Sequence, residues 1–276
     1  MEASLRDLMG DAARRDAAVG AFTCYNLEGA IGVLRAAERR ECGVVLLVSP
    51  ASFRRPGGPS LTAALATLTA RAGVPACVQL DHASDLTLIE DALHAGVHAV
   101  MADGSSLPLE GNLTLVQKTV RMAARFGASV EAELGRIEGD EDVAAAAEAG
   151  ELTDPAQAAD FVERTGVDCL AVSIGNVHGT YMRPPDLDWE RLRRIRERVA
   201  VPLSLHGTSG LARDDVARAI GLGIAKFNVN TELREAYLRA TTDWLAENPG
   251  SDSVLDLNAA QAEAIVEISS RKLGLE

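Results

Sequence analysis

Eight short runs of strand-type residues alternate with longer helical patterns along the 276-residue chain, and this alternation constrains the fold more than any other feature. The runs lie at 19–26, 43–49, 75–82, 98–103, 129–134, 169–174, 202–207 and 226–231. A doubly wound open sheet could share this alternation. Eight strand–helix units at this length favour a closed (β/α)8 TIM barrel, an α/β fold. We expect one domain over residues 1–276, with extra helices at 4–18 and 255–272.

Charge and cysteine content exclude several classes of protein. The formal net charge of −13 repels nucleic acid, and the arginines are scattered through helical patterns. The cysteines at 24, 42, 77 and 169 form no C-x-x-C motif, so we expect reduced, mostly buried thiols. The apolar runs are too short for a signal-peptide core or a membrane span. A soluble, cytoplasmic protein without a nucleic-acid or membrane partner is expected.

The third strand pattern ends in two consecutive ionisable residues, Asp81 and His82, within VQLDHASDL. Asp81 or Ser84 could cap the following helix by accepting hydrogen bonds from its first amides. Alternatively, the pair belongs to a functional site, because TIM barrels place their chemistry at the carboxyl ends of the strands. This segment alone leaves both interpretations open.

Three of the five histidines are predicted at that rim. His82 ends the third strand, His178 follows the sixth in SIGNVHG, and His206 ends the seventh in LSLHG, whereas His94 and His98 lie elsewhere. Three neutral imidazoles with an open fourth position are typical of a catalytic zinc site.

Acidic residues are predicted at the same rim. Asp103 ends the fourth strand, and Glu131 and Glu133 alternate along one face of the fifth. With Asp81, they are candidates either to orient the histidines or to transfer protons.

Two further loops suggest phosphate binding. HGTSG at 206–210 and NVNT at 228–231 follow the seventh and eighth strands, where this fold often holds a phosphate. Gly and Ser also form ordinary turns, so each loop alone is a weak signal. The acidic, Ala-rich stretch 138–151 is either a mobile lid or a solvated surface helix.

Over nearly its whole length, the chain resembles the class II, zinc-dependent ketose-bisphosphate aldolases, which include fructose- and tagatose-bisphosphate aldolases. The resemblance is carried, in order, by AFTCYNLE, LDHASD, MADGS, VEAELGRIEGDED, LTDPAQAADFVERTGVDCLAVSIGNVHGTY, PLSLHGTSG and AKFNVNTELREAY. It implies a lyase of carbohydrate metabolism that splits a phosphorylated sugar into dihydroxyacetone phosphate and an aldehyde, with Zn²⁺ as cofactor. A homodimer or homotetramer is also expected.

The resemblance also implies roles for individual residues. His82, His178 and His206 hold the zinc, and Asp81 exchanges a proton with the hydroxyl at the bond that is cleaved. Glu141 matches a loop acid that helps to move the proton on the ketose carbon. Asp103, Glu131 and Glu133 form either a second metal site or support for the first. Substrate contacts are expected at Ser49, Gly179, Gly207, Thr208, Ser209, Asn228, Asn230, Thr231 and Arg234, with a monovalent cation, Na⁺ or K⁺, beside the phosphate. Arg234 is either a ligand of a distal phosphate or a solvated helix residue.

Several positions depart from the family pattern. Leu47 stands in place of a Gln, Ala83 in place of a Gly or another small or polar residue, and Thr208 in place of a Gly, while Asn176 is unusual. Thr208 either crowds a phosphate-binding amide or adds a hydroxyl. None of these changes removes a zinc ligand or Asp81, so the departures concern the substrate. We favour fructose 1,6-bisphosphate over tagatose 1,6-bisphosphate or a specialised phosphorylated sugar acid.

Two rival functions are weaker. A Schiff-base aldolase needs a lysine in the barrel mouth, yet the lysines are Lys118, Lys226 and Lys272, and Lys226 is expected to open the eighth strand at the opposite end. A barrel that only binds sugar phosphates has no use for three rim histidines beside Asp81.

Overall fold

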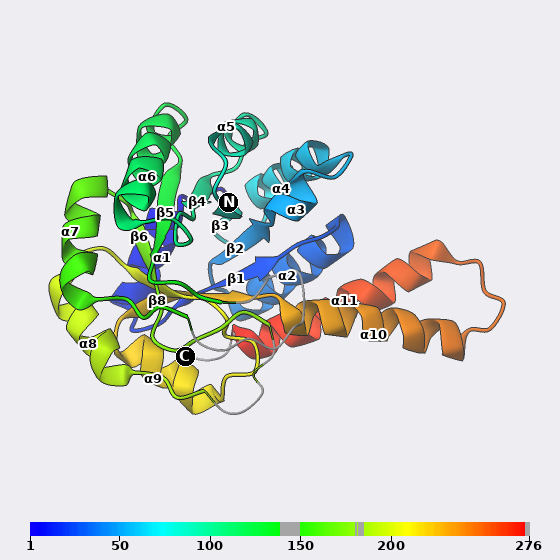
Figure 1. The fold of residues 1–276 in the computed structure, drawn as a ribbon. Coiled ribbons are helices and arrows are strands. Elements are labelled where there is room, and N and C mark those ends of the chain that lie inside the picture. The colour runs from blue at the N-terminus through cyan, green and yellow to red at the C-terminus, as the bar shows by residue number, and fades with distance from the viewer. Residues whose placement is uncertain (139–149, 180, 182–184, 274–276) are drawn as a thin grey trace.

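The computed structural model describes residues 1–138, 150–179, 181 and 185–273, and its central feature is a closed barrel of parallel strands (Figure 1). The strands pair in sequence order, and the last pairs with the first: β1 (Val19–Thr23), β2 (Val44–Val48), β3 (Ala76–Ala83), β4 (Ala99–Ala102), β5 (Ser129–Leu134), β6 (Cys169–Val172), β7 (Leu203–Leu205) and β8 (Ile224–Val229). Eight parallel strands, each followed by a helix, form a closed barrel in this strand order. The predicted TIM barrel is confirmed.

Helices cover the outside of the barrel between the strands: α2 (Leu27–Arg40), α3 (Pro50–Phe53), α4 (Gly58–Arg71), α5 (Leu86–His94), α6 (Leu109–Ala124), α7 (Pro155–Thr165), α8 (Trp189–Arg198) and α9 (Arg213–Gly221). Local capping explains where several begin. Asn26 Oδ1 accepts the Gly29 amide at the start of α2, and Asp154 Oδ1 accepts two amides at the start of α7, where Pro155 occupies the first turn. The apolar faces of the helices pack against outward-facing strand residues in one large core. No helix within the described ranges is both long and apolar enough to cross a membrane.

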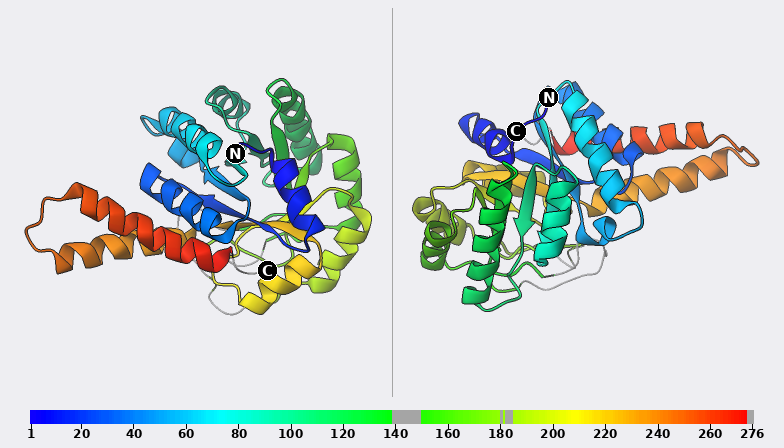
Figure 2. Two further views of the ribbon diagram at one scale, coloured as in Figure 1. Left: turned by 180° about the vertical axis from the view of Figure 1, so that it is seen from behind. Right: turned by 90° about the horizontal axis from the view of Figure 1, so that it is seen from above.

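Three further helices extend the barrel. α1 (Leu5–Arg14) closes its amino-terminal end, where Leu5, Leu8 and Met9 pack into the interior. α10 (Thr231–Glu247) and α11 (Val254–Lys272) form a hairpin that projects away from the barrel in both views of Figure 2, and α11 also packs along α2. The extra helices predicted at 4–18 and 255–272 are therefore present.

The barrel interior has two parts of opposite character. Its amino-terminal part, here called the lower layer, is apolar and consists of Val19, Ala21, Val45, Leu47, Cys77, Ala99, Cys169 and Ala225. Toward the carboxyl ends of the strands lies the buried polar network, which consists of Gln79, Asp81, Glu131, Ser204, His206, Lys226 and Asn228. Buried polar groups need hydrogen-bond partners or a ligand. The functional site is therefore to be sought at the carboxyl end.

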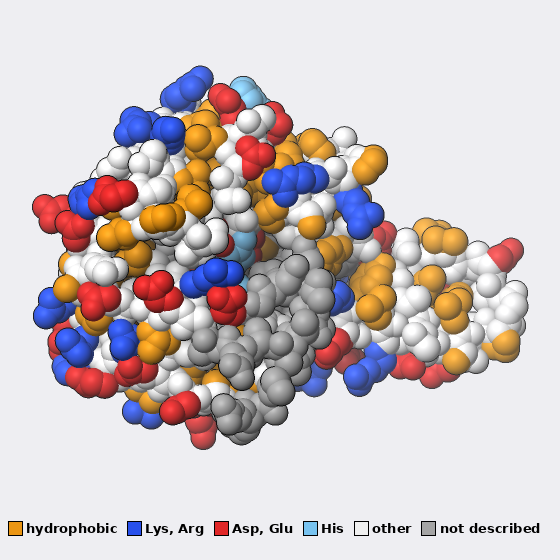
Figure 3. Space-filling view, viewed as in Figure 1, with side chains coloured by type: hydrophobic (Ala, Val, Ile, Leu, Met, Phe, Trp, Pro, Cys, Tyr) orange, Lys and Arg blue, Asp and Glu red, His pale blue; other side chains and the backbone are white. Residues whose placement is uncertain are grey.

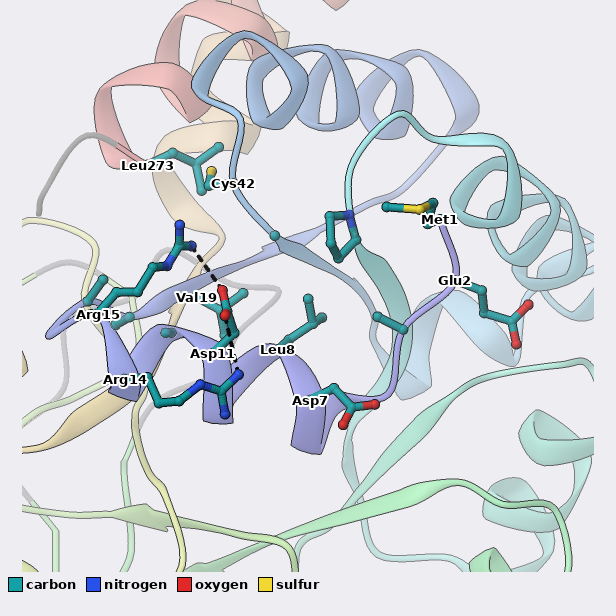
Figure 4. Close-up of a pocket in the computed structure, with 16 residues that line it drawn as sticks. Met1, Glu2, Asp7, Leu8, Asp11, Arg14, Arg15, Val19, Cys42 and Leu273 are labelled. Carbon is teal, nitrogen blue, oxygen red and sulfur yellow. Dashed lines mark hydrogen bonds and ion pairs between the residues drawn. The ribbon is translucent and has the colours of Figure 1, made fainter.

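A cavity of about 330 Å³ lies at the opposite, amino-terminal end beside α1 (Figure 4). Asp11 Oδ1 lies 3.3 Å from Arg14 Nη2, and Asp11 Oδ2 lies 3.2 Å from Arg15 Nη2. In these exposed ion pairs the carboxylate and the guanidinium groups neutralise one another, and such pairs contribute little to stability. None of the described residues that line this cavity is a histidine.

Candidate functional site

The structure brings together the three histidines that were predicted at the rim. His82 lies on β3, His178 in the loop after β6, and His206 directly after β7. The ring centroid of His82 is 4.8 Å from that of each of the other two. One nitrogen of each ring lies within 4.8 Å of those of the other two. Histidine is visible in the middle of the face shown in Figure 3.

A β-bulge explains how the consecutive residues Asp81 and His82 reach one site. Leu80 packs against the surrounding helices and Asp81 faces the interior, so strict alternation would turn His82 outward. Between Leu80 and Ala83 the pairing with β4 changes register, and His82 adopts a left-handed φ of 41°. Such an inserted residue re-aims a side chain. The side chains of both residues therefore lie at the carboxyl-terminal end of the barrel.

The alternative interpretation of this segment, a helix cap, is wrong. Asp85 caps α5, because its Oδ1 accepts the Thr87 amide at 2.9 Å. Asp81 lies inside β3, which extends to Ala83, and no hydrogen bond joins Ser84 to these amides in the described part of the chain. Three polar residues compete for this role in the sequence, and the position of the strand end decides between them.

Carboxylates orient two of the three histidines. His82 Nδ1 lies 2.7 Å from Asp103 Oδ2, and His206 Nε2 lies 2.9 Å from Glu131 Oε1. When one nitrogen of a neutral imidazole donates to a carboxylate, the other keeps its lone pair. Those other nitrogens, His82 Nε2 and His206 Nδ1, lie 2.8 Å apart. With His178 beside them, this donor set fits a metal ion held by three imidazoles.

Acidic residues around His82 form a second possible metal site. His82, Asp103 and Glu133 also offer atoms within 4.8 Å of one another. Glu133 Oε1 accepts the Ile137 amide at 3.0 Å, whereas Oε2 lies 3.8 Å from His82 Nδ1. Burial, together with the charge of Asp103, raises the pKa of Glu133 to about 7. Burial opposes ionisation of Asp103 too, but the hydrogen bond with His82 holds the pKa of Asp103 well below its usual range.

Glu131 connects a candidate metal ligand to the buried polar network. Its Oε1 contacts Ser204 Oγ as well as His206, and its Oε2 accepts Gln79 Nε2 at 2.7 Å. Lys226 Nζ lies 2.9 Å from the same Oε2. Burial opposes ionisation, but the charge of Lys226 keeps the pKa of Glu131 well below its ordinary value. Glu131 is therefore a carboxylate and accepts the His206 proton.

Lys226 lies elsewhere than predicted. β8 begins at Ile224, and its register with β7 shifts just before Lys226, so this side chain is completely buried inside the barrel instead of lying at its amino-terminal mouth. Burial lowers the pKa of Lys226, but the charges of Glu131 and Asp81, with the hydrogen bond to Glu131, together raise it above its usual value. The amine is protonated and donates to Glu131 and Asn228. A protonated, paired amine is no Schiff-base nucleophile, so this rival function fails for a different reason from the one expected.

Asp81 has one oxygen held in place and one without a protein partner. Its Oδ2 accepts Asn228 Nδ2 at 3.0 Å. Among the residues that the structure describes, Oδ1 has no hydrogen-bond partner, although it is buried. An unpaired buried oxygen calls for a ligand. Asn228 Nδ2 also lies 3.2 Å from His206 Nδ1, so it joins Asp81 to the histidine cluster.

The loops after β7 and β8 are tied together at the side of this cluster. Gly207 has a φ of 63°, and an added Cβ would clash with the Val177 carbonyl oxygen, so the position requires glycine. Thr208 Oγ1 donates to the Asn228 carbonyl oxygen at 2.5 Å. The added hydroxyl of Thr208 therefore has a partner within the protein, and the crowding of a phosphate-binding amide stays a prediction. Tyr181 Oη donates to the Gly207 carbonyl oxygen at 2.7 Å.

The other predicted substrate residues lie around these loops. Gly179 directly follows His178, and Ser209 lies in the loop after β7; both are buried. Thr231 is the first residue of α10, whose amino-terminal amides lack partners within the helix.

Ser49, Asn230 and Arg234 lie at the edge of the site. Ser49 follows β2, and its Oγ accepts the Ser52 amide at 3.2 Å as the cap of α3. Asn230 Oδ1 accepts Tyr25 Oη at 3.0 Å. Arg234 is half-buried and lines a cavity of about 290 Å³ with Thr23, Tyr25, Asn26, Gly29, Leu233, Tyr237, Leu238 and Ile265. Arg234 is thus partly withdrawn from solvent, and its role as a phosphate ligand stays a prediction.

The departures from the family pattern differ in their relation to the site. Leu47 belongs to the lower layer, and Ala83 packs in the outer core, so neither contributes a polar contact. Asn176 Oδ1 accepts the Ile174 amide at 2.8 Å, and its Nδ2 donates to the His206 carbonyl oxygen at 3.1 Å. Asn176 therefore ties the loop that carries His178 to the end of β7.

Some predicted residues fall elsewhere, and some site residues were missed. Glu141 and residues 139–149 lie outside the described residues, whereas His94 and His98 lie at the end of α5 and just before β4. The missed residues are Gln79, Ser204 and Lys226. Each precedes a predicted site residue by two positions in a largely apolar strand, and this period-2 pattern of polar residues could have revealed them.

The chain is similar to known aldolases. The sequence profile for fructose-bisphosphate aldolase class-II matches residues 3–275. The YdjI aldolase from Escherichia coli K12 is 33% identical with a TM-score of 0.87, and the match covers 100% of this chain and 97% of that one. A "putative fructose-1,6-biphosphate aldolase" from Coccidioides immitis is 32% identical with a TM-score of 0.89, covering 98% and 95%. Fructose-bisphosphate aldolase from Campylobacter jejuni, 22% identical with a TM-score of 0.82 over 98% and 94%, is similar in fold.

Proposed function

Because the chain belongs to the class II fructose-bisphosphate aldolase family, we propose that this lyase is zinc-dependent and reversibly cleaves fructose 1,6-bisphosphate, or a close analogue, to dihydroxyacetone phosphate and an aldehyde. The observation that carries the proposal is the three-histidine cluster beside Asp81, whose Oδ1 has no partner within the described part of the chain. A barrel that only binds sugar phosphates needs neither feature.

The proposed zinc ligands are His82 Nε2, His206 Nδ1 and a ring nitrogen of His178. When bound, Zn²⁺ supplies positive charge that stabilises the negative charge developing on the substrate as the carbon–carbon bond breaks. Asp103 and Glu131 hold two of the ligands through their other ring nitrogens.

The role of Glu133 distinguishes one metal site from two. Its raised pKa supports a neutral neighbour of the zinc ligands, whereas its place in the second His–Asp–Glu group supports a further metal site. Metal analysis of dialysed protein separates these alternatives. One zinc per chain supports the single site, and a stoichiometry of two supports the second.

The residues of the chain divide the proton transfers between them. Asp81 Oδ1 takes the proton from the carbon-four hydroxyl as cleavage proceeds, while Asn228 holds Oδ2. We assign the proton transfer on the ketose carbon to Glu141 from the family resemblance.

Contacts to the phosphate hold the substrate at a point remote from the reacting bond. Their binding energy helps to orient that bond. We assign these contacts to the residues predicted from the sequence: Ser49, Gly179, Gly207, Thr208, Ser209, Asn228, Asn230 and Thr231. The start of α10 suits an anion. Arg234, in the wall of its cavity, is assigned to the distal phosphate. A Na⁺ or K⁺ ion beside the first phosphate completes the proposal, and a dependence of KM on either cation tests it.

Fructose 1,6-bisphosphate is the preferred substrate in this proposal. Tagatose 1,6-bisphosphate differs only at carbon four, and a phosphorylated sugar acid is a further candidate. Leu47, Ala83 and Thr208 keep a specialised substrate open, and among these three only Thr208 has a side chain that makes a polar contact beside the site. The ratio of kcat/KM for the two bisphosphates, with aldehydes screened in the condensation direction, identifies the substrate.

Metal removal tests the reaction class. A chelator should abolish cleavage and added zinc should restore it, while His94→Ala should leave the zinc content unchanged. The zinc-loaded protein should also exchange a proton of dihydroxyacetone phosphate with solvent, even if neither bisphosphate is cleaved. Absence of this exchange, full activity without metal, or trapping of substrate by borohydride would overturn the proposal.

We further propose a homodimer or homotetramer. The α10–α11 hairpin exposes apolar side chains, including Leu245 at 54% and Leu255 at 81%, and Figure 3 shows hydrophobic residues along it. Exposed apolar patches of this kind favour self-association. Light scattering on the wild type and on Leu255→Asp tests this. A cytoplasmic location is also proposed, which the four free cysteines support.

A further inference from the structure

Lys226 is a completely buried cation beneath the histidine cluster, and none of the roles proposed above uses it. Fully buried lysines are rare unless they are paired. Its Nζ lies 2.9 Å from Glu131 Oε2 and 2.7 Å from Asn228 Oδ1. Each partner leads to a different part of the site.

The first branch runs through Asn228 to Asp81. The two ends of an amide side chain have nearly the same shape, and only their hydrogen-bond partners decide which end is oxygen. An ammonium group only donates, so the atom of Asn228 that faces Lys226 must be Oδ1. The amide nitrogen then points at Asp81 Oδ2, 3.0 Å away. Without the lysine, the amide could turn its oxygen toward the carboxylate and repel it.

The second branch runs through Glu131 to His206. Glu131 is completely buried, and an uncompensated carboxylate in this position would be costly. Lys226 supplies the compensating charge. Glu131 Oε1 then accepts the Nε2 proton of His206 at 2.9 Å, which leaves Nδ1 directed at His82 Nε2.

We propose that Lys226 is a positioning residue that fixes, from beneath the site, both the direction of the Asn228 amide at Asp81 and the ring of His206 as a metal ligand. Lys226 acts through these two neighbours rather than on the substrate. The inference rests on the proposed aldolase function, but its metal branch can be measured without any substrate.

The variant Lys226→Met tests the metal branch. Methionine keeps the length of the side chain but donates no hydrogen bond and leaves Glu131 without its counter-charge. We expect the zinc dissociation constant, measured by competition with a chromophoric chelator, to rise at least about 10-fold. In the double variant Lys226→Met with Glu131→Gln, position 131 no longer carries an unpaired buried charge, and the oxygen of the introduced amide can still accept the His206 proton. Zinc affinity should return to within about threefold of wild type.

The same two variants distinguish the Asn228 branch from the metal branch. At saturating zinc, both should lose cleavage, with kcat/KM about 100-fold below wild type, because Asn228 has lost its donor in each. If Lys226 acts through Asn228 on Asp81, the loss requires Asp81. In an Asp81→Asn background, Lys226→Met should therefore lower kcat/KM by less than about threefold further.

Lys118→Met is the matched control, because this lysine is exposed on α6. It should match wild type in zinc affinity and cleavage. Thermal melts compare the fold of all variants, and if Lys226→Met does not fold, the charge-neutral double variant supports the cleavage comparison, alone and with Asp81→Asn.

Three outcomes would overturn the inference: wild-type zinc affinity in Lys226→Met, undiminished cleavage in Lys226→Met, or the same multiplicative loss with and without Asp81. The proposed function fails separately. If wild-type protein loaded with zinc neither cleaves a bisphosphate nor exchanges the proton of dihydroxyacetone phosphate, the aldolase proposal falls, and the zinc affinities alone decide the role of Lys226.

Discussion

The lower layer and the buried polar network occupy the same barrel, yet they are built on opposite principles. The lower layer packs small and branched apolar side chains, and α1 closes it. Such packing depends on volume and has no preferred partner. In the polar network, most polar atoms have a specific hydrogen-bond partner, and Asp81 Oδ1 is one of the exceptions within the described residues. Buried ion pairs such as the one between Lys226 and Glu131 add little net stability, because both charges lose their hydration. We therefore expect the lower layer to carry stability and the polar network to carry chemistry.

Removing the proposed proton acceptor should have the largest effect and would affect chemistry alone. Asp81→Asn keeps the size of the side chain but cannot take a proton, so kcat/KM for cleavage should fall about 1,000-fold while zinc content stays at the wild-type level. Steady-state kinetics and metal analysis measure the two quantities. Asp85→Ala serves as the control in the same segment: it removes the cap of α5, costs about 1 kcal/mol of unfolding free energy and spares kcat/KM. Equal losses of activity in both variants would contradict the assignment of Asp81.

A cavity created by a substitution where α1 packs against the lower layer should affect stability alone. Leu5 is completely buried where α1 closes the barrel, so Leu5→Ala should lower the free energy of unfolding by about 2–5 kcal/mol. Urea unfolding gives this value, and kcat at 25 °C should match wild type. Leu107→Ala, at a site that is 47% exposed and away from the α10–α11 hairpin, should cost far less unfolding free energy than Leu5→Ala. A fall in kcat for Leu5→Ala would show that the two layers are coupled.

Glu133 should make the metal-free protein less stable as the pH rises. Its folded pKa of about 7 lies above the ordinary value of 4.5, so the folded state binds more protons between these values, and stability falls as pH rises through about 7. The full loss is about 3 kcal/mol. Glu133→Gln stays neutral and should lack this loss while it keeps an acceptor for the Ile137 amide. Urea unfolding of both chelator-treated proteins from pH 5 to 8 measures the difference, and parallel curves would show that Glu133 ionises without cost.

The smallest expected effect concerns the hydrogen bond between the loops after β7 and β8, which we propose to bind phosphate. Thr208→Val keeps the shape of the side chain but loses the bond to the Asn228 carbonyl oxygen, which is worth about 1 kcal/mol. KM for dihydroxyacetone phosphate in the condensation direction should rise about fivefold. Thr208→Ser retains the hydroxyl and should match wild type. If both variants behave alike, the hydroxyl does not organise these loops.

The barrel could be predicted from the sequence because strand and helix periods recur eight times, and a misplaced residue does not change such a pattern. The convergence of His82, His178 and His206 follows from the barrel itself, since all the strands end at one rim. The orientation of individual side chains does not follow. His82 and Lys226 both lie where a strand changes register with its neighbour, and such a shift depends on the pairing of two strands, which the pattern within either strand does not reveal. The cap of α5 was missed for a similar reason. Asp85 is the cap because β3 ends shortly before it, and the sequence pattern does not reveal where β3 ends.

The bulge in β3 has a mechanical consequence. Asp81 and His82 are joined by one planar peptide unit, so their Cα atoms stay about 3.8 Å apart however the barrel flexes. The distance from Asp81 to Asn228, in contrast, spans from β3 to β8 and changes whenever these strands slide or separate. On warming, Asp81, the proposed proton acceptor, and His82, a proposed metal ligand, should therefore keep their backbone spacing. Thermal loss of activity below the unfolding temperature should begin on the β8 side of the barrel.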